Sequence, residues 1–109
     1  MSDIFLSYAH EDVERARQLA QALERKGWDV FWDRTIPAGK NWRSYIGEKL
    51  EQASCVVVAW SKDSVASNWV IEEADSGLER NALVPVLLET VRLPLGFRQV
   101  HAEDLSANR

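Results

Sequence analysis

The sequence predicts an α/β fold in which a parallel β-sheet is covered by helices on both faces. Two observations lead to this prediction. Short apolar runs alternate with segments whose apolar residues recur at helical spacing, an order typical of right-handed βαβ units. The run CVVVAW at residues 55–60 is apolar throughout, as expected of a strand that is buried on both faces. The chain of 109 residues is long enough for one domain with one core.

The individual elements follow from local patterns. The run IFLS at 4–7 predicts the first strand, and Asp12 is a residue type suited to cap the helix that follows, which Gly27 can end. Pro85 cannot donate to a strand ladder, so its strand is expected at an edge of the sheet or with a bulge. Further strands are expected at 28–32, 55–60 and 83–88, with a short fifth one near 98–101, and helices at about 42–53 and 69–80.

The composition argues against several classes of function. The net charge of -4 and the absence of a basic run make nucleic acid an unexpected partner. No stretch approaches the ~18 apolar residues of a membrane span, and the first residues do not have the pattern of a secretory signal. The single Cys55 excludes an internal disulfide, and with two histidines far from it there is no zinc ligand set. We therefore expect a cytoplasmic protein without a metal site.

The carboxyl ends of the strands in a parallel sheet share one edge, where ligands of such folds bind. Four of the five tryptophans are expected there, beside carboxylates and hydroxyls, which favours an aromatic-walled cleft for a flat ligand. Each tryptophan taken alone is equally compatible with a core anchor, and His10 and His101 are expected to be surface residues. The residues placed on this edge are Ser7, Tyr8, His10, Trp32, Asp33, Arg34, Trp42, Trp60, Ser61, Ser67, Trp69, Glu72 and Glu73.

Common ligand motifs of this fold class do not occur. The turn after the first strand, SYAHED, has no glycine, so it is not the dinucleotide-binding turn of hydride-transferring enzymes, and there is no GxxxxGK[ST] loop. A phosphate-accepting response regulator needs an aspartate at the end of the third strand, where this chain has Trp60 and Ser61.

Several segments, in this order along the chain, resemble those of Toll/interleukin-1 receptor (TIR) domains, in particular bacterial ones. IFLSY at 4–8 resembles the first box of the family, and DRTIPAGKNW at 33–42 resembles its BB loop. CVVVAWSKDSVASNWVIEE at 55–73 is similar to the third strand and the following Trp–Glu segment, and LVPVLL and LPLGFR are similar to the later boxes. The resemblance covers nearly the whole chain.

The resemblance implies a flavodoxin-like fold with strand order 2-1-3-4-5. It also implies association with other TIR domains through the BB loop, Asp33 to Asn41, as a homo-oligomer or filament. Since a last helix of the domain is not evident, residues 1–109 are expected to be a single TIR domain excised from a longer multidomain protein.

In members that cleave NAD+, the catalytic glutamate lies four residues after the tryptophan of the Trp–Glu segment. Carried over from Trp69, this position is Glu73, whereas helical geometry alone does not choose between Glu72 and Glu73. The resemblance places substrate contacts at Ser7, Tyr8, Asp33, Arg34, Trp42, Trp60, Ser67 and Trp69, with Phe5 as a further position.

We therefore predict an NAD+ nucleosidase (NADase) that acts in bacterial immune, antiphage signalling, with NAD+ as substrate and no cofactor. It would release nicotinamide and ADP-ribose or a cyclic ADP-ribose isomer. One carboxylate is enough for this reaction, because nicotinamide leaves as a neutral molecule and needs no general acid. Two alternatives remain: a non-catalytic TIR–TIR interaction domain that acts as a scaffold, and a nucleoside-processing hydrolase or transferase of the same fold.

Overall fold

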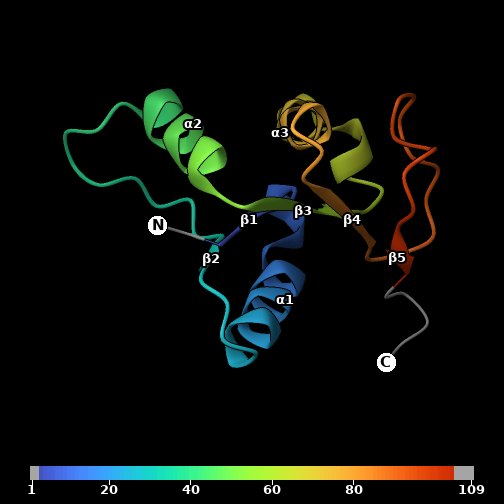
Figure 1. Ribbon diagram of the computed structural model, residues 1–109, viewed down its shortest axis with the longest axis horizontal. Helices are drawn as coiled ribbons and strands as arrows, with labels where there is room; N and C mark the ends of the chain where they lie inside the picture. Colours follow the sequence, from blue (N-terminus) through green and yellow to red (C-terminus); the bar gives the residue numbers. More distant parts are fainter. Residues whose placement is uncertain (1–2, 105–109) are drawn as a thin grey trace.

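Five parallel strands form one sheet in the order β2-β1-β3-β4-β5 in the computed structural model, which describes residues 3–104 (Figure 1). This observation confirms the predicted α/β class and the 2-1-3-4-5 strand order. The strands are β1 (Ile4–Ser7), β2 (Val30–Phe31), β3 (Cys55–Trp60), β4 (Leu83–Leu87) and β5 (Glu103–Asp104).

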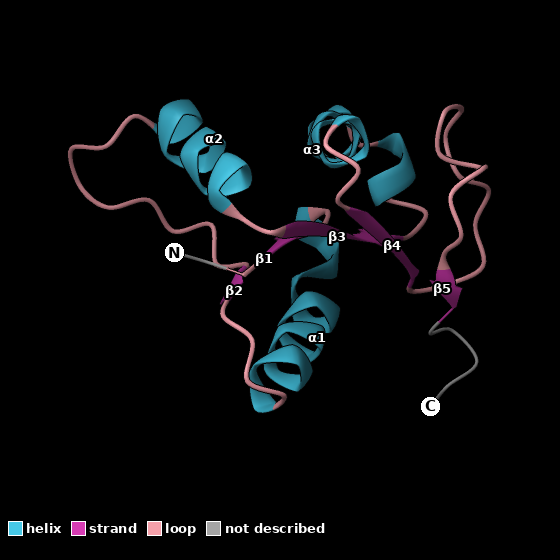
Figure 2. Ribbon diagram, viewed as in Figure 1, coloured by secondary structure: helices cyan, strands magenta, loops and turns pink. Residues whose placement is uncertain are grey.

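Helices cover both faces of this sheet. The helix α1 (Val13–Arg25) packs on one face, whereas α2 (Trp42–Gln52) and α3 (Asn68–Glu79) lie on the other (Figure 2). Two short 3-10 helices, η1 (His10–Asp12) and η2 (Ser64–Ala66), precede α1 and α3. None of the helices in residues 3–104 is both long and apolar enough to cross a membrane.

The alternation of side chains along the central strands divides the core into two layers. In β1, Ile4 and Leu6 face α1, while Phe5 belongs to the cluster under α2 and α3. In β3, Val57 faces α1 and Val58 faces α3 in the same way. Because both faces are covered, the residues of β1 and β3 are apolar, except Ser7 at the end of β1.

Three predictions about the strands need correction. β2 has two residues instead of five, with Trp28 about half exposed beyond its start. The fifth strand lies at 103–104 and not at 98–101. β4 is not an edge strand, and Pro85 stays in continuous register opposite Val58 without a bulge. The sheet accepts this proline because β5 pairs only with Val86 and Leu87, so Pro85 lies before the part of β4 that has a neighbour on that side.

Local capping fixes the starts of the two helices that carry the candidate site. The Asn41 side chain accepts a hydrogen bond from the Ser44 N–H at 3.0 Å at the start of α2. Ser67 does the same for the Val70 N–H at 3.3 Å at the start of α3. Such caps satisfy N–H groups that have no partner within the helix.

Candidate active site

The two adjacent glutamates of α3 lie in opposite environments. Successive residues of a helix point about 100° apart. Glu72 is exposed, whereas Glu73 is 3% exposed and lies on the face of α3 that packs on the sheet. Ser7, fully buried at the end of β1, donates a hydrogen bond from Oγ to Glu73 Oε1 at 2.6 Å. The end of β1 and the second turn of α3 therefore meet at the Glu73 carboxylate.

A guanidinium group holds the same carboxylate from the other side. Arg34, three residues beyond β2, donates from Nη1 to Glu73 Oε2 at 2.9 Å and from Nη2 to Oε1 at 3.2 Å. Nη2 also donates to the Leu6 carbonyl oxygen at 2.9 Å. This bidentate pairing is a strong interaction geometry between an arginine and a carboxylate. Both oxygens of Glu73 are thus occupied in this structure.

Aromatic rings surround the Arg34 guanidinium. Its central carbon lies 4.8 Å from the ring centre of Phe5, 5.3 Å from that of Tyr8 and 5.9 Å from that of Phe31. The faces of these rings attract a cation. Burial raises the pKa of the Tyr8 phenol, which stays protonated and donates to the Trp32 carbonyl oxygen at 2.7 Å.

A cavity of about 210 Å³ opens beside this ion pair. Two tryptophans from different helices form part of its wall: Trp42 of α2 and Trp69 of α3 stack with ring centres 4.6 Å apart and planes inclined by 22°. The cavity is lined by Tyr8, His10, Arg34, Trp42 and Trp69, and we call it the indole cavity.

A second cavity of about 180 Å³ shares Trp69 with the first. It lies between α2 and α3, and the guanidinium of Arg43 lies 5.9 Å from the Trp69 ring centre on this side. Its walls are Arg43, Ile46, Gly47, Leu50, Trp69, Glu72 and Glu73. Trp69 therefore lies between the two cavities, and Glu73 lines the second one.

Of the predicted site residues, Ser7, Tyr8, Arg34, Trp42, Trp69 and Glu73 come together here. Three others, Asp33, Ser67 and Trp60, neither line the indole cavity nor form hydrogen bonds with the Arg34–Glu73 ion pair. Asp33 is exposed and accepts hydrogen bonds from the N–H and hydroxyl of Thr35, which lower the pKa of Asp33. Ser67 is used as the cap of α3, and Trp60 is fully buried against Phe97, with ring centres 5.5 Å apart. The described residues include no group of three or more His, Cys, Asp or Glu side chains that could hold a metal ion.

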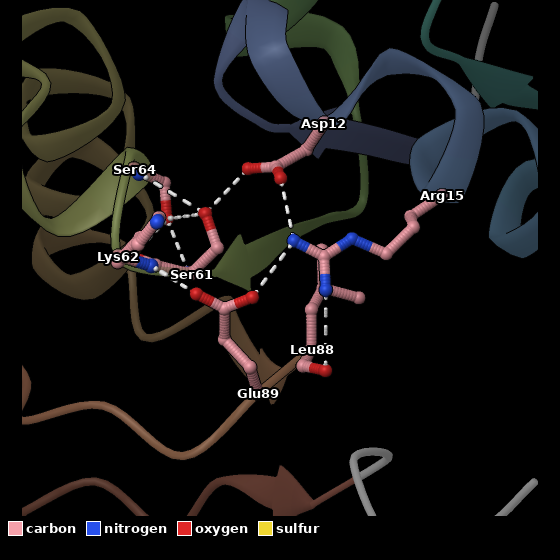
Figure 3. Close-up of polar contacts among 7 residues, drawn as sticks. All are labelled: Asp12, Arg15, Ser61, Lys62, Ser64, Leu88 and Glu89. Atoms are coloured by element: carbon pink, nitrogen blue, oxygen red, sulfur yellow. Dashed lines mark hydrogen bonds and ion pairs between the residues drawn. The ribbon is translucent and has the colours of Figure 1, made fainter.

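Sequence reasoning missed a second polar cluster at the same edge of the sheet (Figure 3). Asp12 lies at the N-cap position of α1, but its side chain makes no cap hydrogen bond. The buried carboxylate instead accepts hydrogen bonds from Ser61 Oγ and, at 2.6 Å, from Arg15 Nη2. Arg15 also contacts Glu89 at 3.0 Å, and Glu89 accepts from the Lys62 N–H at 2.7 Å. We call this cluster the Asp12 clasp, and it ties the start of α1 to the ends of β3 and β4.

His10 lies at the edge where the sequence placed it, and its side chain is exposed as expected. Its place in the wall of the indole cavity was not predicted. Its position three residues after Ser7, on the edge where strands end, is the one signal in the sequence that points to the site.

The sheet order defines a flavodoxin-like α/β domain, and the aromatic cavity at the strand ends is its candidate ligand site. The sequence profile described as TIR domain matches residues 4–109, and the chain therefore belongs to the TIR-domain family.

Similar proteins come from plants and animals. The chain is 30% identical to the disease resistance protein RPP2B of Arabidopsis thaliana over 80 residues, which is 72% of this chain and 6% of that protein. The TIR domain of the Toll-related receptor TRR-2 from Hydra magnipapillata has the same fold, with TM-score 0.89 and 24% identity over 99% of this chain and 87% of that one. The TIR domains of the activated Roq1 resistosome match with TM-score 0.68 and 30% identity over 80% of this chain and 57% of that one.

Proposed function

We propose that this domain is an NAD+ nucleosidase that cleaves the bond between nicotinamide and ribose, in a bacterial immune or antiphage response in the cytoplasm. One observation carries the proposal: of two adjacent glutamates, Glu73 is buried beside an aromatic cavity at the ligand edge, and Glu72 is exposed. The TIR-domain family includes members that cleave NAD+. The products are nicotinamide and ADP-ribose or a cyclic isomer of ADP-ribose.

The chemistry requires little beyond one carboxylate. When the bond between C1′ of the ribose and the pyridinium nitrogen breaks, its electron pair passes to nitrogen and nicotinamide leaves uncharged. Positive charge develops at C1′, and a fixed carboxylate facing it lowers the energy of that transition state. Water then adds its oxygen to C1′ and loses a proton to solvent, or an internal nucleophile of ADP-ribose closes a ring. Glu73 supplies the carboxylate, and the indoles of Trp42 and Trp69 exclude water and stack with flat rings.

Arg34 must release Glu73 before the carboxylate can act on a substrate. Both carboxylate oxygens are occupied by Arg34 and Ser7, so at least one of these contacts has to open. Arg34 belongs to the segment 33–41, which joins β2 to α2 and projects from the body of the domain (Figure 1). Within the segment 33–41, residues Pro37 to Lys40 are exposed. We infer that self-association through this loop moves Arg34 and frees Glu73.

A cleavage assay with matched variants tests the proposal. The wild-type domain is incubated with NAD+ in dilute solution and under conditions that promote assembly, and nicotinamide is quantified. Glu73→Gln should lose cleavage, because the neutral amide cannot stabilise the positive charge, while Glu72→Gln should retain it. Full activity of Glu73→Gln in an assembled, active preparation would exclude the role given to Glu73.

The second candidate function is a non-catalytic scaffold that binds other TIR domains. The closed Arg34–Glu73 ion pair favours it, since a carboxylate that is 3% exposed and doubly paired is also suited to a structural role. A scaffold would form oligomers through the projecting loop and release no nicotinamide in any assembled state. Measuring the size of the assembly and the nicotinamide released in the same sample separates the two candidates.

A further inference from the structure

The imidazole of His10 lines the indole cavity. Neither the fold nor the Arg34–Glu73 ion pair explains its presence there. His10 begins η1, directly after the turn that leaves β1, and faces the cavity with Tyr8, Arg34, Trp42 and Trp69. Imidazole is an uncommon wall for a purely aromatic cavity because it can donate hydrogen bonds and carry a charge near neutral pH.

The backbone that carries His10 is held firmly in place. The Asp12 N–H donates to the Ala9 carbonyl oxygen at 2.8 Å and closes the turn. The Asp12 clasp then fixes the other end of η1, because Ser61 and Arg15 both donate to the buried Asp12 carboxylate (Figure 3). A side chain on such a turn is pre-positioned, and a ligand that it binds does not have to order the loop.

The contacts around the cavity leave the exposed His10 imidazole as an accessible polar group of the wall. Arg34 is the cationic residue of the wall, but its two terminal nitrogens donate to Glu73 and to the Leu6 carbonyl oxygen, and its Nε, which has no hydrogen-bond partner, is buried. Among residues 3–104, the His10 side chain makes no hydrogen bond to a protein group. An anionic group that enters the cavity can therefore accept a hydrogen bond from His10, beside any donor that Arg34 offers once it has released Glu73.

The proposed substrate contains such a group. In NAD+ the ribose that would face Glu73 is joined through one carbon to a diphosphate, which the Glu73 carboxylate would repel unless a cation lies between them. The cavity of about 210 Å³ is smaller than the roughly 300–1,000 Å³ that encloses a drug-sized ligand, so it suits one part of a dinucleotide and not the whole.

We propose that His10 binds the diphosphate of the dinucleotide substrate. An imidazole N–H donates a hydrogen bond to a phosphate oxygen and so sets the scissile ribose beside Glu73. This inference rests on the proposed function for its substrate, while the diphosphate contact itself is measurable without catalysis. His10 contributes to binding and takes no part in breaking the bond.

Kinetics provide the first half of the test. His10→Ala should raise KM for NAD+ about tenfold or more, the effect of losing a hydrogen bond to a charged group, with a much smaller change in kcat. With nicotinamide riboside, which has the same scissile bond and no phosphate, the change in KM should be much smaller. The other histidine of the chain, His101, lies next to β5, and the variant His101→Ala should behave as the wild type.

A binding measurement provides the second half and does not depend on activity. Because the chain has two histidines, the imidazole NMR spectrum contains two sets of signals, which His101→Ala assigns. ADP-ribose should shift the His10 signals, and adenosine, which lacks the diphosphate, should not. If the wild type cleaves NAD+ but His10→Ala has an unchanged KM and ADP-ribose leaves His10 unmoved, the inference is wrong and the proposed function stands. If no preparation cleaves NAD+, the proposed function fails, and the ADP-ribose titration alone decides whether His10 binds a diphosphate.

Discussion

Replacing Arg34 by methionine should destabilise the domain far more than its position near the surface indicates. The side chain of Arg34 is 21% exposed, but its partner Glu73 is 3% exposed. Methionine keeps most of the volume and removes the charge, so Glu73 is left as a buried carboxylate with Ser7 as its one remaining donor among the contacts described. Breaking a buried ion pair by removing one partner costs about 3–5 kcal/mol.

The reverse change should cost less. Glu73→Gln keeps an acceptor for the Ser7 hydroxyl, and the guanidinium it leaves behind is partly exposed and still bonded to the Leu6 carbonyl oxygen. The double variant Arg34→Met, Glu73→Gln contains no buried unpaired charge. We therefore expect it to be more stable than Arg34→Met alone, with a coupling free energy on the order of 2 kcal/mol between the two sites.

Urea unfolding of the four proteins, followed by circular dichroism, measures each free energy of unfolding and closes the cycle. For a domain of this size, a loss of ~3 kcal/mol corresponds to a fall in Tm of roughly 12 °C, which thermal melts check independently. A loss below about 1 kcal/mol in Arg34→Met, or two single losses that simply add, would show that the ion pair is not the buried, coupled unit described above.

Three further changes have expected outcomes. Gly77→Ala should destabilise the domain by about 1–3 kcal/mol, because the new Cβ would lie 2.9 Å from the Val56 Cβ, whereas Gly47→Ala in α2 has open space and should be neutral or stabilising by up to about 1 kcal/mol in the same urea assay. The Lys62 N–H and Arg15 hold the pKa of Glu89 below its usual value, so the stability that Glu89 contributes is present above about pH 4.3 and is lost on further acidification. The wild type should therefore lose more stability than Glu89→Gln between about pH 6 and pH 3. Equal losses would contradict this. Burial, with a smaller effect of Asp3, raises the pKa of the Cys55 thiol, so iodoacetamide should alkylate the folded domain more slowly at about pH 8 than the urea-unfolded chain, as mass spectrometry can measure.

The alternation of the sheet is the part of the structure that the sequence predicts best. The apolar run of β3 indicates burial on both faces, and its residues do divide between the two core layers. The strand order, by contrast, came from the resemblance to TIR domains, because no local pattern states which strand lies next to which. The strand β2 was predicted too long and β5 was misplaced, because so short a pairing depends on the neighbouring strand and not on its own residues.

The choice between the two glutamates shows where a further sequence signal was available. Helical reach from Trp69 does not separate Glu72 from Glu73. The buried residues of α3 are Val70, Glu73, Ala74 and Gly77, at spacings of three and four, so Glu73 lies in the stripe that faces the sheet and Glu72 does not. Arg34 was expected to contact substrate, and no periodicity reports its pairing with Glu73, because that contact joins a loop to a helix 39 residues away.

The stacked indoles of Trp42 and Trp69 also give the domain an optical signal of its own. Two identical chromophores in contact at a fixed inclination couple their electronic transitions, and the resulting circular dichroism depends on their separation and mutual angle. One ring belongs to α2, directly after the projecting loop, and the other begins α3 near Glu73. Any event that shifts these helices relative to each other, or inserts a flat ring between them, will therefore change the spectrum of the unlabelled protein.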